Sequence, residues 1–159
     1  MNNKDNKEKR ATRTISQIER GTVIDHIDPH VVFQVVRILR IDDQVEETVT
    51  VGTNLQSNVL GKKGIIKIAN RFLTQDDVNK LSVVSPNATV SIIEDYVVKE
   101  KFKVKIPEKV EGIIRCPNSN CVTNTEEWPT RFKVTERDPL VLFCTYCERF
   151  VRKDEIEIL

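Results

Sequence analysis

The four cysteines constrain the fold of this chain more than any other feature of its sequence. They lie near the C-terminal end as two close pairs, Cys116 with Cys121 and Cys144 with Cys147. The spacing is C-x4-C, then twenty-two residues, then C-x2-C. Such a pattern is typical of a tetrahedral zinc site, because each pair supplies two thiolates from one tight turn. We therefore expect one Zn²⁺ bound by all four cysteines.

Disulfides and ordinary buried cysteines are the alternatives to a metal site. Residues 1–10 contain no apolar stretch of the kind that a signal peptide needs, and no apolar run approaches the roughly 18 residues that span a bilayer. The expectation is a cytoplasmic protein without a membrane segment, in which cysteines stay reduced. Pairwise clustering also argues against ordinary buried cysteines. Four thiolates leave no open position for water, so we expect the metal to be structural rather than catalytic.

Charge is distributed unevenly along the chain. Residues 1–20 carry six Lys/Arg and three Asp/Glu, whereas residues 106–159 carry eight Lys/Arg and ten Asp/Glu. A nucleic-acid binder concentrates positive charge on its reading domain, so the acidic cysteine-bearing end argues against that class of protein. The sequence also lacks HExxH, GxSxG and Walker patterns, and cysteines committed to zinc cannot act as nucleophiles.

The first hundred residues alternate between strand and helix patterns. Asp28-Pro29 predicts the start of a helix, and Thr74 with Asp77 predicts a capped start for another. The predicted elements are strands at 14–27, 45–54, 61–69, 89–93 and 96–104, and helices at 28–40 and 74–84. This order predicts an α+β fold, a split βαβ (ferredoxin-like) arrangement with a mostly antiparallel sheet and both helices on one face.

Ile106-Pro107 is the predicted boundary between two domains. Beyond it lie about fifty residues with short strand-like runs at 110–114, 130–134, 140–143 and 150–152. A unit of this size rarely folds by apolar burial alone, so we expect a small all-β zinc domain whose metal supplies much of its folding free energy. The predicted organisation is a mobile tail at 1–13, a binding domain at 14–106 and a zinc domain at 107–159.

Two dense motifs resemble one known family. Residues 20–27, RGTVIDHI, and residues 116–121, CPNSNC, resemble segments of the regulatory chain of aspartate carbamoyltransferase. The C-x-Y-C-E run at 144–148, the GKK of 61–63, and ATV at 88–90 followed by YVV at 96–98 fall in the expected order and spacing. The resemblance covers nearly the whole chain from about Ile15.

The resemblance implies a non-catalytic allosteric subunit in pyrimidine biosynthesis. Members of the family bind CTP as inhibitor and ATP as activator in the N-terminal domain, and UTP acts beside CTP. Their regulatory chains form dimers that bridge catalytic trimers, and the zinc domain holds the catalytic chain. The resemblance therefore implies nucleotides, catalytic chains and a second copy of this chain as partners, and neither nucleic acid nor membrane.

Carried over by motif, the resemblance also implies the site residues. The nucleotide site would comprise Ile15, Ile18, Asp25, His26, Lys63, Ile65, Lys67, Ser91, Ile93, Tyr96, Val98 and Lys101. The contacts to the catalytic chain would include Asn118, Asn120, Glu148 and Arg149. Two positions depart from the best-known members: Ser91 replaces an asparagine and Val84 replaces an aromatic residue.

Two other classes of protein remain as alternatives at this point. A zinc-ribbon protein that binds nucleic acid would share the cysteine pattern but would carry a basic, aromatic-bearing ribbon. A small nucleotide-binding enzyme would show turnover by the isolated chain. From the residues alone, the chain is a two-domain α+β protein with a structural zinc that serves as a binding module.

Overall fold

The chain is described here from a computed structural model, which covers residues 17–41 and 46–159. The predicted tail at 1–13 and the first residue of the predicted strand at 45–54 lie outside the described residues. The chain divides into two compact units, Met1–Lys105 and Ile106–Leu159. Each unit forms its own β-structure, one sheet in the first unit and two in the second.

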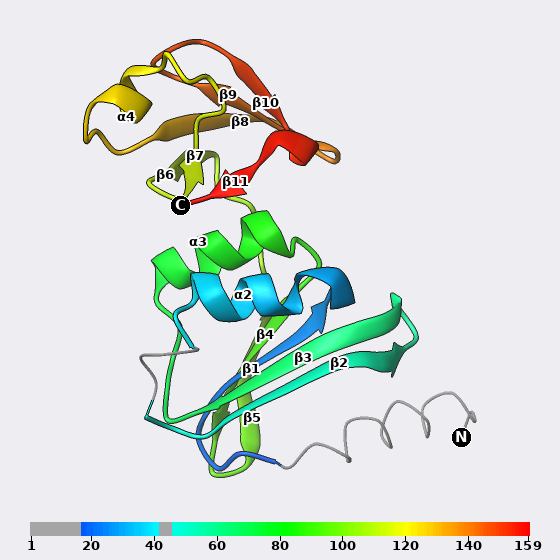
Figure 1. Ribbon diagram of the computed structural model, residues 1–159. Helices are drawn as coiled ribbons and strands as arrows, with labels where there is room; N and C mark the ends of the chain where they lie inside the picture. The colour runs from blue at the N-terminus through cyan, green and yellow to red at the C-terminus, as the bar shows by residue number, and fades with distance from the viewer. Residues whose placement is uncertain (1–16, 42–45) are drawn as a thin grey trace. The chain divides into compact units, whose positions relative to one another are not determined.

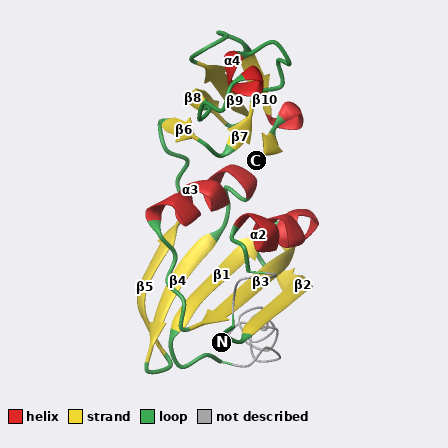
Figure 2. Cartoon of the chain, turned by 60° about the vertical axis from the view of Figure 1, so that its left-hand side comes forward, coloured by secondary structure: helices red, strands yellow, loops and turns green. Residues whose placement is uncertain are grey.

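The N-terminal unit contains one five-stranded sheet in the order β2-β3-β1-β4-β5, in which all neighbouring strands are antiparallel (Figure 1). In chain order its elements are β1 (Gly21–Ile27), a 3-10 helix (Pro29–Val31), α2 (Val32–Ile38), β2 (Val49–Ser57), β3 (Gly61–Ala69), α3 (Gln75–Val84), β4 (Thr89–Glu94) and β5 (Val97–Lys103). Figure 2 shows both helices on the same face of the sheet. The predicted split βαβ arrangement with one appended strand is confirmed.

The core of this unit lies between the helices and one face of the sheet. Ile24, Ile66 and Val90 are directly opposed across β1, β3 and β4, and none is more than 1% exposed. Val35 of α2 and Leu81 of α3 belong to the same buried cluster and are fully buried. Because side chains alternate along a strand, the residues next to these in sequence point to the opposite face of the sheet.

Local sequence signals account for the helix ends. Thr74 accepts a hydrogen bond from the backbone N–H of Asp77 at 3.1 Å, and the Asp77 carboxylate accepts one from the N–H of Thr74 at 3.0 Å. This is the predicted capping box, which satisfies two N–H groups that the first helical turn leaves unpaired. Asp28 likewise accepts from the N–H of His30 at 2.9 Å.

Three predicted boundaries in this unit were wrong. The strand predicted at 45–54 is β2, which runs from Val49 to Ser57. The helix predicted from Asp28 to Arg40 is a short 3-10 turn followed by an α-helix that ends at Ile38, because Arg40 has a positive φ of 50°. The strand predicted from Thr14 begins at Gly21 within the described residues. Gly21 has a φ of 138°, and a Cβ there would lie 2.0 Å from the carbonyl oxygen of Ile68, so only glycine fits this start.

The C-terminal unit is built from short strands. A four-stranded sheet has the order β10-β9-β8-β6, and β11 pairs with β7. The elements are β6 (Lys109–Glu111), β7 (Ile114–Arg115), α4 (Val122–Thr125), β8 (Arg131–Arg137), β9 (Leu140–Cys144), β10 (Phe150–Arg152), a 3-10 helix (Lys153–Glu155) and β11 (Glu157–Ile158). The single strand predicted at 110–114 is two strands, because the chain turns at Gly112 with a φ of 65°. The one-turn helix α4 and the strand β11 were not predicted.

Within the described ranges of the chain, no helix combines the length and apolar character needed to cross a membrane.

Candidate metal centre and effector site

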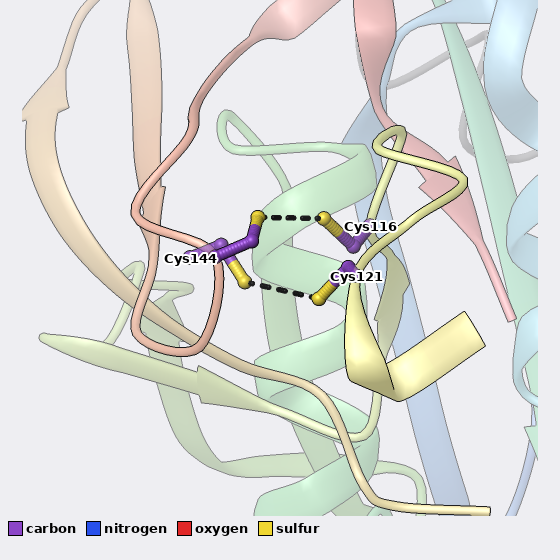
Figure 3. A group of neighbouring side chains, drawn as sticks. Cys116, Cys121 and Cys144 are labelled. Carbon is purple, nitrogen blue, oxygen red and sulfur yellow. Dashed lines mark hydrogen bonds between the residues drawn. The ribbon is translucent and has the colours of Figure 1, made fainter. Parts of the chain in front are cut away.

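The four cysteines of the C-terminal unit converge on one point. Figure 3 shows three of them, Cys116, Cys121 and Cys144, with their side chains turned toward one another. Their Sγ atoms all lie within 4.8 Å of one another. The Sγ–Sγ distance is 3.6 Å from Cys116 to Cys147 and 3.8 Å from Cys121 to Cys144. A disulfide needs about 2.0 Å, so these are free thiols. Metal–sulfur bonds of about 2.3 Å at tetrahedral angles place sulfurs about 3.8 Å apart, so the spacing fits one four-coordinate metal ion.

Each cysteine lies at or close to one end of a strand or helix. Cys116 directly follows β7, and Cys121 is the residue before α4. Cys144 ends β9, and Cys147 lies in the turn that leads to β10. This turn is closed by hydrogen bonds from the N–H of Glu148 to the carbonyl of Cys144 and from the N–H of Cys144 to the carbonyl of Arg149, both at 2.9 Å. Two separate turns, one between β7 and α4 and the other between β9 and β10, therefore supply the two pairs of sulfurs.

Hydrogen bonds from the loops point at the sulfurs. The Thr123 hydroxyl donates to the Cys121 Sγ at 3.2 Å. Burial raises the pKa of the Cys116 thiol and that of Cys144. Burial also acts to raise the pKa of Cys147, but hydrogen bonds from the backbone N–H of Arg149 and from the side chains of Asn118, Cys116 and Cys144 together outweigh it and lower this pKa to about 7. Such donors stabilise thiolates, which is the form that binds a metal.

The four residues predicted to contact the catalytic chain surround this centre. The side chain of Asn118 accepts from the N–H of Asn120 at 3.1 Å, which folds the first cysteine loop. Glu148 has a φ of 63° in the second turn, and Arg149 forms an ion pair with Glu155 at 2.6 Å. These residues are thus held on the two metal-binding turns, although their role as contacts remains a prediction.

The predicted nucleotide residues lie mainly on the sheet face opposite to α2 and α3. Strand register places Lys67, Val23, Ser91 and Lys101 directly opposite one another across β3, β1, β4 and β5. Directly opposed residues share a face, so these four side chains form what we call the first row. Two residues along the strands, Asp25, Thr89 and Lys103 are opposed in the same way and form the second row.

The second row contains a compact polar network. The Lys63 ammonium lies 3.0 Å and 3.1 Å from the two carboxylate oxygens of Asp25. The same carboxylate accepts from the backbone N–H of His26 at 2.6 Å, and the His26 Nδ1 lies 3.2 Å from the Thr89 hydroxyl. His26 has a φ of 56° and lies in the irregular stretch of β1 between Ile24 and Ile27, which turns its ring toward β4.

Two lysines of β3 are unusually buried. Lys63 and Lys67 are only 3% and 5% exposed. Burial lowers the pKa of Lys67 below its ordinary value of 10.5, and the negative charge of Asp25 acts in the opposite direction. Ile65 lies between them on the same face and is 1% exposed. A polar sheet face with buried cations is costly to fold and is therefore a candidate site for an anionic ligand.

The remaining predicted residues extend this face toward the β4–β5 hairpin. Ile93 and Val98 are directly opposed, and with Gly21 they form the apolar row, two residues beyond the first row. Tyr96 lies in the hairpin turn, is 61% exposed, and donates its backbone N–H to the carbonyl of Glu19 at 2.9 Å. Ile18 lies just before β1 and is partly buried, and Ile15 lies outside the described residues.

Comparison with known proteins identifies the family. The model of the aspartate carbamoyltransferase regulatory chain, allosteric domain, matches residues 13–105, and that of its metal binding domain matches residues 108–157. The chain belongs to the family of aspartate carbamoyltransferase regulatory chains. Members of this family are non-catalytic subunits, which agrees with the absence of a catalytic motif from the sequence.

Named regulatory chains match almost end to end. The chain is 48% identical to that of Methanopyrus kandleri over 147 residues, which is 91% of this chain and 94% of the relative. It is 47% identical to that of Pyrococcus abyssi over 143 residues, 89% of this chain and 94% of the relative. For Bacteroides thetaiotaomicron the identity is 43% over 145 residues, again 91% and 94%. The family's two domains therefore cover the two units described above.

Sequence reasoning missed two residues of the sheet face opposite to α2 and α3. Thr89 contacts His26 across 63 positions of sequence, which no local pattern reveals. Lys103 shares the second row with Asp25 and Thr89, and only the strand register places it there. The sequence signal that comes closest is the alternation of lysines at 99, 101, 103 and 105.

Proposed function

We propose that the chain binds CTP as an inhibitor and ATP as an activator of an aspartate carbamoyltransferase, with UTP acting beside CTP. One observation carries this proposal: Lys67, Ser91 and Lys101 form one row across a sheet face that the helices leave uncovered, beside the Asp25–Lys63 pair. This face offers cations for phosphates, a carboxylate for a sugar hydroxyl, and apolar side chains for a base.

The three rows suggest how a nucleotide lies on the sheet. Ile93 and Val98 pack against the base, with Tyr96 at the hairpin end of the same row. Asp25 bonds the ribose or, with His26, orients the ligand. Ser91 supplies a hydroxyl where the best-known members of the family have an asparagine. The polyphosphate lies near Lys67 and Lys101, because charge-assisted hydrogen bonds from ammonium groups to phosphate oxygens are short and strong.

Within the same proposal, the metal of the C-terminal unit is Zn²⁺ with a structural role. The support is the ligand set, since four thiolates at tetrahedral spacing are the donors of closed zinc sites. The four cysteines fix both turns, and these turns present Asn118, Asn120, Glu148 and Arg149 to a catalytic chain. The C-terminal unit is thus the part that holds the catalytic chain. Dimers of the regulatory chain bridge catalytic trimers.

Regulation then follows from linkage. Effectors that bind two quaternary states with different affinities shift the balance between those states, typically by about 1–3 kcal/mol of coupling free energy. The chain itself carries out no chemistry. It changes the activity of the catalytic chain by favouring one state of the complex.

The decisive experiment measures carbamoyl-aspartate formation by the cognate catalytic chain, with and without the zinc-loaded regulatory chain, while CTP is titrated. We expect inhibition by CTP only when the regulatory chain is present. Association without any CTP response would leave the partner assignment standing and would refute the effector assignment. Failure both to associate and to confer a response would refute the proposed function and would favour a zinc-ribbon role.

Two substitutions test nucleotide binding and the structural role of the metal separately. Lys101→Ala should weaken CTP binding at least about ten-fold, because it removes an exposed cation from the first row. It should leave association with catalytic chains unchanged. Cys144→Ser should abolish that association, and normal association by this variant would refute the structural role of the metal.

A further inference from the structure

We infer that Lys103 is a further phosphate-binding residue, and that it makes the site prefer nucleoside triphosphates over monophosphates. The inference rests on the proposed function, since it concerns the same face of the sheet. It adds the second row to the part of that face that contacts phosphate groups. Nothing in the sequence motifs singles out this lysine.

Strand register places Lys103 beside residues already assigned to the site. It is directly opposite Thr89 on β4, and Thr89 is directly opposite Asp25 on β1. Ser91 and Lys101 form the adjacent pair of the first row, two residues along each strand. Residues two apart on a strand share a face, so Lys101 and Lys103 form a pair of neighbouring cations on β5.

A bulge in β5 is what turns these two lysines toward the site. The register shifts between Ile92 and Ile93, so that Val98 opposes Ile93 whereas Lys101 opposes Ser91. Simple alternation from Val98 would instead have turned Glu100 and Phe102 to this face. The bulge thus replaces a carboxylate and a phenyl ring with two ammonium groups where a polyphosphate would lie.

The charges of the face leave Lys103 available for a ligand. The carboxylate of Asp25 is already paired with Lys63 at 3.0 Å. Among the described residues, no carboxylate lies within ion-pair distance of Lys101 or Lys103, and both side chains are exposed. A triphosphate carries more negative charge than Lys67 and Lys101 offset together, whereas a monophosphate does not need a third cation.

The direction of the three rows accounts for selectivity. The apolar row, the first row and the second row follow one another along the strands, about 7 Å apart for each step of two residues. Asp25 and Lys103 lie at opposite ends of the second row, on β1 and β5, so a ribose held by Asp25 leaves the β5 end free. A base on Ile93 and Val98, with its ribose turned toward β1, puts the first phosphate near the first row, which holds Lys67 and Lys101. Only the outer phosphates of a triphosphate then extend to Lys103 in the second row.

The test measures binding of CTP and CMP to the zinc-loaded full chain by calorimetry, in the wild type and in Lys103→Gln. We expect the substitution to weaken CTP about ten-fold, as for the loss of one charge-assisted contact, and CMP by less than about two-fold. Lys103→Arg should retain the preference for CTP. Lys62→Gln is the matched control, because Lys62 is an exposed lysine of β3 that alternates with Lys63 and so lies on the other face.

Three outcomes would overturn the inference. Equal losses for CTP and CMP would place Lys103 away from the outer phosphates. An effect no larger than that of Lys62→Gln would show that Lys103 contributes only net charge. Failure of the wild-type chain to bind CTP, ATP or UTP would refute the proposed function itself, and this result is distinguishable because it precedes any substitution.

Discussion

The two units of this chain are stabilised by different means. In the N-terminal unit, two helices cover one face of a five-stranded sheet and bury a cluster of Ile, Val and Leu side chains. In the C-terminal unit, strands of only two to seven residues surround four thiols that lie within 4.8 Å of one another. An apolar core tolerates a polar opposite face, so the first unit is free to use that face for a ligand. The second unit is organised around the four thiols of its metal-binding site.

This difference predicts independent responses to metal removal. Chelation, or Cys144→Ser, should unfold the C-terminal unit and leave the N-terminal sheet intact, because a structural zinc supplies about 10–16 kcal/mol of apparent binding free energy. Trp128, the one tryptophan of the chain, lies in the C-terminal unit with its ring centroid 5.8 Å from that of Tyr146. Its fluorescence should therefore report the loss of that unit while far-UV circular dichroism retains the N-terminal signal.

Ser119→Ala is the control for this experiment, because it alters the same loop at an exposed position without removing a ligand. It should change neither metal content nor fluorescence. Simultaneous loss of both signals on chelation would contradict the comparison and would mean that the two units fold as one.

The next largest effect should come from the apolar core of the N-terminal unit. Leu81→Ala removes a fully buried side chain of α3, and the lost burial and the resulting cavity should cost about 2–5 kcal/mol of unfolding free energy. Urea unfolding followed by circular dichroism measures this change. Val59→Ala, at a position that is 71% exposed, should cost almost nothing. A loss of zinc affinity in Leu81→Ala would break the comparison, since the metal site should not sense this core.

The features that could be predicted from the sequence also differ between the two units. The spacing of the cysteines was enough to predict their convergence, because a metal imposes one geometry on any chain that supplies such ligands. The bounds of β3, Gly61–Ala69, and the Thr74–Asp77 capping box were also predicted, because both depend on neighbouring residues. Short elements such as α4 and β11 were missed, since four or two residues carry no periodic signal.

The sheet face opposite to α2 and α3, the proposed nucleotide site, was only partly predictable. Alternation along β3 grouped Lys63, Ile65 and Lys67 correctly on one face. Alternation fails on β5, where the bulge changes which side chains face the site, and the register that decides this is a property of two strands together. The contact of His26 with Thr89 likewise depends on the irregular end of β1. Sequence patterns describe single strands well and pairs of strands poorly.

Lys67, a buried lysine of the proposed nucleotide site, gives a pH-dependent prediction. Burial lowers the pKa of Lys67, so the folded chain without a ligand loses this positive charge at a lower pH than the unfolded chain does. This lysine therefore weakens folding at pH values below its lowered pKa, and the penalty disappears as the pH rises toward 10.5. A bound polyphosphate favours the charged form, so CTP affinity should fall as the pH rises through the lowered pKa.

Calorimetric titrations of CTP between neutral pH and pH 10 test this expectation. In Lys67→Gln the affinity should be lower at neutral pH and should lose the part of the pH dependence that Lys67 contributes. Lys62→Gln should keep the wild-type profile, because Lys62 lies on the other face of β3. An unchanged profile in Lys67→Gln would show that Lys67 does not contact the phosphates.

The smallest effect tests whether the N-terminal unit depends on local signals as well as on its core. Thr74→Ala removes the hydroxyl that accepts the Asp77 N–H at 3.1 Å and should lower the unfolding free energy by about 1 kcal/mol. Thr74→Ser keeps an acceptor in place and should restore most of that loss, as measured by urea unfolding of the same unit. Because the cap acts on the first turn of α3 alone, Trp128 fluorescence and metal content should not change. If Thr74→Ala lowered the unfolding free energy by more than Leu81→Ala does, the helix end rather than the apolar core would stabilise the N-terminal unit. The contrast with the metal-stabilised unit would then need a different physical basis.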